Sequence, residues 1–499
     1  MGISNFPAEL LSDTFLIHVR AEQRQLESDS MIIPQWKDIY SPLYVCKQWN
    51  NVMMHYPLLW DFVSMSSSVE CISAMLERSK GVPLQVQPTG PERHSQIYNE
   101  QGLRLVLEQS HRIQHLMIYV TDEVARVISS CFCPPIPLPM IRSLSVSNET
   151  TGSVTNTIPS QAQAIFPFEP STSLQIVNIS GYSITQLKRA MRPALQSVSL
   201  LPSEAMHQHG SASERMKNEY VDDEPKSSLY KTLEYLAQMS HLQDIRIRHW
   251  FPNETWKQPL GRIVFNHLRS LSVYLRSAEA DFLKYLLCPP GLRLHLTVHC
   301  RTFRDNIMST LLKDSSEACG FWGHDKTREM IRALEVCHTV EGFSTLKCWT
   351  TVVPSLDLKN DGPKAMPHLQ IDFDRCETMN ASAVCSAVTN SLPLEELDSL
   401  TLSFPTKYFS GRDISTLRSA FQTIKTTKVL VVRNWRECEV CGFLFNPRVI
   451  FPLLQELRAV TLCRLPEKNV MFRYDFPNIS VLEEERRAFG MPIKISVIE

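Results

Sequence analysis

The sequence has almost no net charge. Its 51 Lys and Arg residues are balanced by 52 Asp and Glu residues, which gives a formal net charge of -1. A chain so balanced produces no overall field that would attract a phosphate backbone or an anionic membrane. We therefore expect neither nucleic acid nor a membrane as a partner.

Long apolar runs and glycine-rich loops are also missing. No run approaches the roughly 18 apolar residues that cross a bilayer, and the first residues lack the charged and apolar regions of a secretory signal. Only 16 of the 499 residues are Gly, and neither a phosphate-binding loop nor a nucleophile elbow is found. We expect a cytoplasmic or nuclear protein with no catalytic residues and no cofactor.

The chain contains 14 Cys residues. In a chain without a secretory signal they are expected to be reduced and mostly buried. Cys438 and Cys441 have the spacing of a zinc-binding or redox-active pair, but a zinc site needs four ligands and no second pair follows. We therefore expect no metal site.

What is present is an ordinary globular composition, with 43% hydrophobic and 21% charged residues. The apolar residues are concentrated near the start of the chain. Pro7 suits the first turn of a helix, and apolar residues at helical spacing predict a helix over about 7–20, followed by a polar interruption, "RAEQRQLESDS". Ser41 as N-cap and Pro42 predict a second helix that ends near His55, because Pro57 follows.

These elements carry more apolar surface than about 60 residues can bury by themselves. Either a partner protein or the rest of the chain must cover it. The residues alone leave both possibilities open.

The order of motifs in this region is similar to the F-box-like module of many fungal proteins. "FPAELLSDTFL" is followed by "LYVCKQWNNVMMHYPLLW" and then by "AMLERSKGVPLQVQ". The resemblance covers about the first 87 residues. It implies a small helical module that docks on the Skp adaptor of a cullin-based ubiquitin ligase, while the remainder of the chain selects a protein substrate.

The resemblance assigns ten residues to the core of this module or to its adaptor surface. They are Pro7, Leu10, Leu11, Phe15, Leu43, Val45, Cys46, Trp49, Leu59 and Trp60. Thr14 departs from the usual Ile, and in an apolar stripe its hydroxyl would need a hydrogen bond. The polar insertion after Arg20 is a second departure.

After residue 90 a hexapeptide spacing, apolar-x-x-apolar-x-apolar, returns repeatedly, and Gln or Arg nearly always follows its first residue. Its copies begin at Ile113, Ile141, Leu174, Leu195, Leu242, Leu268, Leu397 and Leu457. The spacing is typical of the strand of a leucine-rich repeat. The region 301–367 has few such signals, and "DKTREMIRALEVC" suggests a helix there.

The sequence therefore predicts an α/β protein. A helical F-box-like module with its linker helix would occupy 1–90, and an irregular leucine-rich-repeat-like solenoid of parallel strands backed by helices and loops would occupy 91–499. The first hypothesis is a non-catalytic substrate receptor of a ubiquitin ligase. A ligase-independent repeat scaffold with a decayed adaptor surface, and an enzyme that uses Cys438 and Cys441, are the alternatives.

Overall fold

The computed structural model divides the chain into two compact units, 1–242 and 243–499. The structure describes residues 6–28, 40–88, 99–132, 135–148, 167–182, 191–201, 229–248, 261–276, 282–299, 305–321, 330–338, 344–351, 366–374, 381–404, 417–433, 443–444, 451–460 and 479–498.

The described part of the first unit begins with four helices, which we call the helical module (residues 6–60). They are α1 (Ala8–Ser28), the 3-10 helix η2 (Ser41–Tyr44), α3 (Lys47–His55) and the 3-10 helix η3 (Pro57–Leu59). Helix α1 is longer than predicted, because the polar "RAEQRQLES" consists mostly of good helix formers and continues it. Its predicted end near Arg20 is wrong.

The second predicted helix is also different from the expectation. Ser41 is not an N-cap but the first residue of η2, and the α-helix begins only at Lys47. Cys46 is its N-cap, with an extended backbone and a thiol that accepts a hydrogen bond from the Trp49 N–H at 3.5 Å. The predicted end at His55, before Pro57, is confirmed.

The sheet of the first unit starts earlier than residue 91. Strand β1 directly follows the helical module, and β2 pairs with it in parallel. Each further strand of the row β1-β2-β3-β5-β7-β8 joins its neighbour in parallel and in chain order. The strands are β1 (Phe62–Ser64), β2 (Leu84–Gln87), β3 (Ile113–Val120), β5 (Ser143–Asn148), β7 (Ile176–Ser180) and β8 (Ser197–Leu201).

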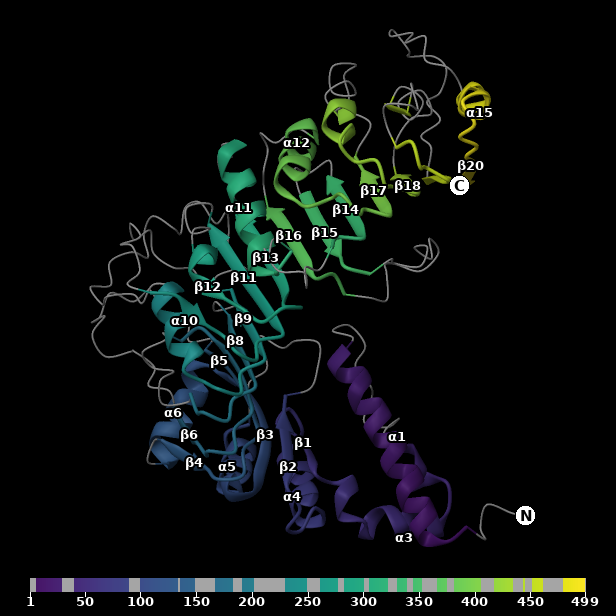
Figure 1. Cartoon of the computed structure of the whole chain (residues 1–499). Coiled ribbons are helices and arrows are strands. Elements are labelled where there is room, and N and C mark those ends of the chain that lie inside the picture. The colour runs from purple at the N-terminus through teal and green to yellow at the C-terminus, as the bar shows by residue number, and fades with distance from the viewer. Residues whose placement is uncertain are drawn as a thin grey trace, which may run out of the picture. The chain divides into compact units, whose positions relative to one another are not determined.

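Helices connect the early strands of this row (Figure 1). Parallel neighbours require such crossovers, since a tight turn cannot join them. The connecting elements are α4 (Val69–Arg78), α5 (Glu100–Glu108), the 3-10 helix η4 (Ser110–Arg112) and α6 (Asp122–Cys131), with the separate parallel pair β4 (Ile136–Leu138) and β6 (Phe168–Pro170) and, later, α10 (Leu229–Ala237).

The second unit contains a longer row of strands. Its order is β9-β11-β13-β16-β15-β14-β17-β18-β19-β20, and β15 alone runs antiparallel to both of its neighbours among the described strands. The strands are β9 (Asp244–Ile247), β11 (Ser270–Arg276), β13 (Arg293–His299), β14 (Ala333–His338), β15 (Ser344–Trp349), β16 (Leu369–Asp374), β17 (Ser399–Ser403), β18 (Val429–Arg433), β19 (Glu456–Val460) and β20 (Lys494–Ile498).

Helices accompany this row as well (Figure 1). Helices α11 and α12 contact each other, and their described apolar side chains are buried. The remaining elements are α11 (Asp305–Ala318), α12 (Ala381–Ser391), α15 (Ile479–Ala488) and the short pair β10 (Ile263–Val264) and β12 (Leu286–Leu287). Among the described residues, no helix is long and apolar enough to span a membrane.

The hexapeptides form these strands in a shared register. In the first unit Leu116, Leu144, Val177 and Val198 are paired across successive strands, and each is buried. In the second unit Ile245 pairs with Leu271, and Leu271 with Leu294. The fourth residue of each copy therefore points into the core.

Two interpretations in the second unit are wrong. "DKTREMIRALEVC" does not end as a helix: its described part leads into β14, and Ile331, just before this strand, makes a further copy of the hexapeptide with Leu334 and Val336. In β19 the copy begins at Leu454 rather than at Leu457, because Leu457 pairs with Leu430 and Leu430 with Leu400, the fourth residue of its own copy.

The Gln or Arg at the second position has a place in this register. Its backbone N–H donates to the carbonyl of the equivalent residue on the preceding strand. Gln175 donates to Arg142 at 2.9 Å, Gln196 to Gln175 at 2.8 Å and Arg269 to Gln243 at 2.7 Å. The second-position residue thus makes the first backbone hydrogen bond between neighbouring strands, and the side chains of Arg142 and Arg269 are exposed.

Candidate functional site

The core of the helical module is built by one stripe of α1. Leu11, Phe15 and Val19 recur every four residues, and at most 4% of each is exposed. The Phe15 ring meets the half-buried Trp49 of α3 edge to face, with 5.0 Å between the ring centres. The stripe is therefore covered by this chain.

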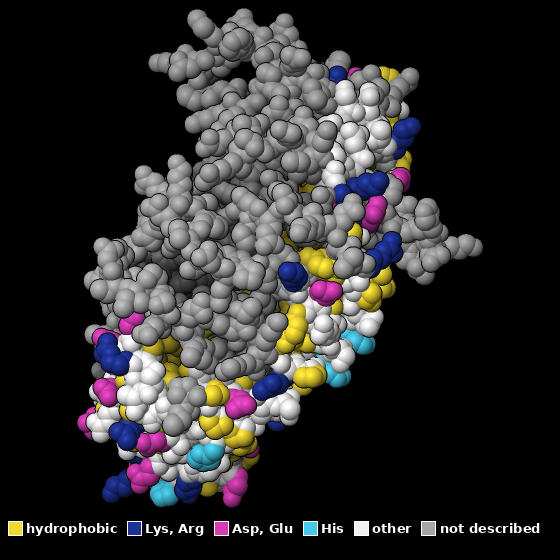
Figure 2. All heavy atoms as spheres, turned by 90° about the vertical axis from the view of Figure 1, so that its left-hand side faces the viewer, with side chains coloured by type: hydrophobic (Ala, Val, Ile, Leu, Met, Phe, Trp, Pro, Cys, Tyr) yellow, Lys and Arg dark blue, Asp and Glu magenta, His cyan; other side chains and the backbone are white. Residues whose placement is uncertain are grey.

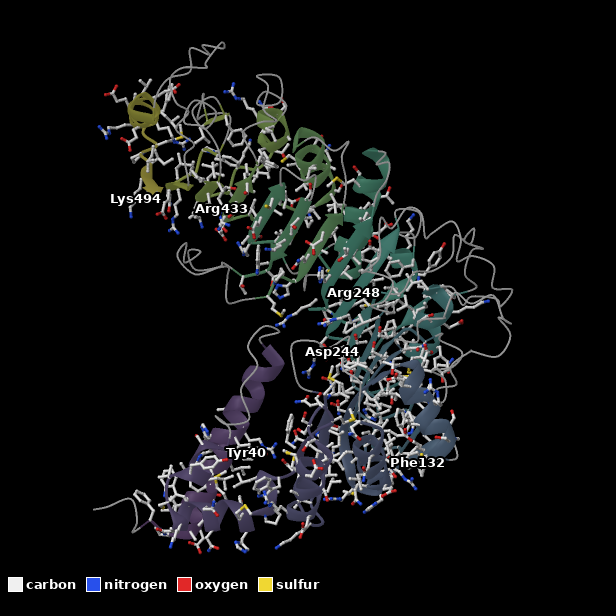
Figure 3. All side chains as sticks on the ribbon, turned by 180° about the vertical axis from the view of Figure 1, so that it is seen from behind. Tyr40, Phe132, Asp244, Arg248, Arg433 and Lys494 are labelled. Carbon is white, nitrogen blue, oxygen red and sulfur yellow. The ribbon has the colours of Figure 1, made fainter. Side chains whose placement is uncertain are left out.

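Trp60 is the second anchor. Its indole N–H donates to the Met53 carbonyl at 2.8 Å, and the Tyr40 ring stacks on it at 5.0 Å. The Arg78 guanidinium lies 4.5 Å from the centre of the Trp60 ring, a cation–π distance. Tyr40 lies beside the N-terminal helices (Figure 3), and burial raises the pKa of its hydroxyl.

A different set of apolar side chains in the same module is exposed to solvent. Leu10 and Ile17, seven residues apart, share the other face of α1, with 53% and 72% of their surfaces exposed. We call the five most exposed of them the apolar surface: Phe6, Leu10, Ile17, Tyr44 and Val45. Helix α1 contacts α3, and the Gln48 side chain of α3 donates to the Phe6 carbonyl at 3.3 Å.

The ten residues assigned from the sequence fall into two groups. Leu11, Phe15, Leu59 and Trp60 are buried, and Leu43 and Trp49 are half-buried. Pro7, Leu10, Val45 and Cys46 are exposed. The first group holds the module together, while Leu10 and Val45 belong to the apolar surface.

Thr14 does not lie in the buried stripe. It is exposed on α1, and its hydroxyl donates to the Leu10 carbonyl one turn earlier at 2.7 Å. The expected cost of an unsatisfied hydroxyl is therefore absent. The polar insertion after Arg20 continues α1 and does not break the module.

An ion pair ties α1 to the sheet of the first unit. The Arg20 guanidinium donates to the carboxylate of Asp61, which is 5% exposed and directly precedes β1. Gln85 of β2 contacts the same pair: with its amide oxygen facing α1, it accepts from Arg20 Nη1 at 2.7 Å. Burial raises the pKa of Asp61, although the Arg20 hydrogen bond and charge act in the opposite direction.

No protein-family model matches this chain, and no curated protein matches it. The interpretation of the site therefore depends on its own residues.

The second unit presents a row of polar side chains on the face opposite its buried leucines. His295 lies 2.6 Å from the Asp372 carboxylate, and Lys347 lies 3.4 Å from Glu335. Burial alone would raise the pKa of Asp372, but hydrogen bonds from His295 and Gln370 bring it below its ordinary value. Arg433 and Lys494, on β18 and β20, mark the later part of this row (Figure 3).

Figure 2 shows another side of the molecule, and on its described part the Lys and Arg side chains are interspersed with Asp and Glu. Within the described ranges, no group of three or more His, Cys, Asp or Glu residues could hold a metal ion. Cys438 and Cys441 lie outside the described residues.

The sequence did not point to Arg112, which is 5% exposed and lies just before β3. Its guanidinium donates to the carbonyls of Leu76 and Val82, each at 3.1 Å, and to the Ser79 hydroxyl at 3.0 Å. It thereby satisfies acceptors around the end of α4. The only feature of the sequence that could have pointed to Arg112 is its position directly before Ile113, the first residue of a hexapeptide.

Proposed function

We propose that the protein is an F-box-like substrate receptor that docks on the Skp adaptor of a cullin-based ubiquitin ligase. The main support for this proposal is the apolar surface. Leu10, Ile17 and Val45 stay more than half exposed although the module beside them has a buried core. A surface of this kind, next to a finished core, fits a protein partner.

The role of the remaining chain follows from the same proposal. In the first unit, β3, β5, β7 and β8 pair in parallel and in chain order and each contains the fourth and sixth residues of a hexapeptide, which supports a degenerate leucine-rich-repeat solenoid. Its polar face would hold a protein target. The receptor would do no chemistry, and it would raise the concentration of the target near the ubiquitin-conjugating enzyme.

One observation favours the alternative of a ligase-independent scaffold. The buried stripe of α1 is covered by this chain, and Arg20 fixes α1 to Asp61. Helices that dock on their own chain need no adaptor. The two functions differ in what they require of the exposed residues, since only the receptor needs Leu10 and Val45.

The test is binding of the purified full-length chain to purified Skp adaptor. Leu10→Asp places a charge in the apolar surface and should weaken adaptor binding by about 2 kcal/mol or more, as central interface residues do. The fold should survive because Leu10 is 53% exposed. A change at Leu11, which is 4% exposed, would mix binding with unfolding.

The control is Leu453→Asp, at a residue of the second unit with the same exposed fraction, 53%. It should bind the adaptor as the unmodified chain does. Failure of the unmodified chain to bind, or equal binding by Leu10→Asp, would contradict the receptor role and favour the scaffold.

A further inference from the structure

Two strands at the start of the second unit, β9 and β13, lie on either side of β11 and carry a group of arginines on their polar face. Arg246 and Arg248, at and just after β9, and Arg293 on β13 are all exposed, while their sequence neighbours Ile245, Ile247 and Leu294 are buried in the core. Asp244 and Arg248 lie at the two ends of this stretch (Figure 3). We call Arg246, Arg248 and Arg293 the basic patch.

The register places small residues between the arginines. Arg246 lies opposite Ser272 on β11, and Arg293 lies opposite Ser270. Strands are about 4.8 Å apart, so β9 and β13 are separated by about 10 Å, with the short serine side chains as a floor between them. An arginine side chain from either strand can lean over that floor.

The other charged groups on this face leave the patch positive. Asp244 shares the cross-strand row of Ser270 and Arg293 and is the acidic residue on β9. His295 is engaged with Asp372. Among the described residues, no ion pair involves any of the three arginines.

The spacing of the arginines indicates what they fit. Arg246 and Arg248 are two residues apart on an extended stretch, so their side chains leave the same face about 6.8 Å apart. An extended peptide repeats its side chains on one face at the same interval. Carboxylates at alternate positions of an extended peptide would therefore face Arg246 and Arg248 one by one, whereas one compact anion would contact only some of the arginines.

We propose that the basic patch binds an extended acidic segment of a protein, with Asp or Glu side chains at alternate positions. Each carboxylate would accept charge-assisted hydrogen bonds from an arginine, and the serines would leave room for the peptide backbone. This inference rests on the proposed receptor function, because it names the chemistry of the target.

The experiment measures peptide binding to the full-length chain without adaptor, so failure here is separate from failure of adaptor binding. The probe is a fluorescein-labelled decapeptide with Glu at alternate positions, compared with its Gln counterpart by fluorescence anisotropy at low salt. The Glu peptide should bind about tenfold more tightly than the Gln peptide, and added salt should weaken its binding.

The variant Arg246→Glu, Arg248→Glu should lose that difference. Its control is Arg126→Glu, Arg487→Glu, which changes the net charge equally at exposed positions of α6 and α15 and should bind as the unmodified chain does. Binding that both double variants lose equally would overturn the proposal, since it would reflect net charge alone.

Two further probes separate other anions. The Gln peptide with a single phosphoserine should bind less tightly than the Glu peptide, and an arrangement selective for one phosphate would show the reverse. A single-stranded DNA oligonucleotide of equal charge should also bind less tightly. Preference for either of these probes, or no binding of the Glu peptide, would overturn the proposal.

Discussion

Asp61 and Arg20 show how one partly buried pair connects the helical module to the sheet. Because Asp61 is 5% exposed, desolvation is the largest influence on its carboxyl group, and its pKa is raised despite the paired Arg20. Burying such a pair costs free energy that its attraction only partly returns. Its contribution is to position α1 rather than to stabilise the fold.

A pH dependence follows from this shift. Between its ordinary pKa of 3.8 and the raised value, Asp61 binds its proton more tightly in the folded chain, so its contribution to the free energy of unfolding falls as pH rises through that window. Asp61→Asn removes the titration. The unfolding free energy of the variant minus that of the unmodified chain should therefore rise through the window and then level off.

Denaturant unfolding of both proteins at a series of pH values gives this difference. The loss of the Arg20 partner shifts the whole curve but not its shape. Two parallel curves would show that Asp61 titrates alike in the folded and unfolded chains.

At the same scale, Leu10 and Leu11 mark the limit of the sequence. Both were assigned to the module from one motif, yet one is 53% and the other 4% exposed. Adjacent helical residues point about 100° apart, and two apolar stripes on one helix do not reveal which stripe the chain itself covers. The sequence assigned Phe15 and Trp60 to the module, but it did not predict which of the ten assigned residues form the core and which remain exposed.

Among the elements, strands were predicted correctly where all three apolar positions of the hexapeptide were present. Prediction failed where flanking residues favoured a helix or where a missing apolar residue shifted the pattern. Ile331, Leu334 and Val336 follow "DKTREM", whose charged residues favour a helix. Pairing of β14 with β15 and β17 overrides that local preference. In β19 the sixth position is Ala459, so apolar residues three positions later gave the wrong phase.

Ile331 tests this new assignment. It is fully buried as the first residue of its hexapeptide, so Ile331→Ala should lower the free energy of unfolding by about 2–4 kcal/mol. Met366 stands at the equivalent distance before Leu369 but is 70% exposed, and Met366→Ala should change stability by less than about 0.5 kcal/mol. Denaturant unfolding compares the two, and equal losses would contradict the assignment of Ile331 to the core.

At the scale of the molecule, the sequence correctly predicted an α/β chain with a largely parallel sheet. It did not predict the antiparallel β15, because the order of β14, β15 and β16 depends on pairing between segments whose spacing is irregular. It also did not predict that the sheet begins at Phe62, since β1 and β2 are short and carry only part of the repeated pattern.

The proposed binding of the apolar surface to the Skp adaptor can be measured by hydrogen–deuterium exchange of the full-length chain with and without the adaptor. We predict slower exchange in peptides that cover 6–17 and 43–46, with unchanged exchange in the strands of the second unit. Unchanged exchange throughout, or protection confined to the second unit, would contradict the proposal.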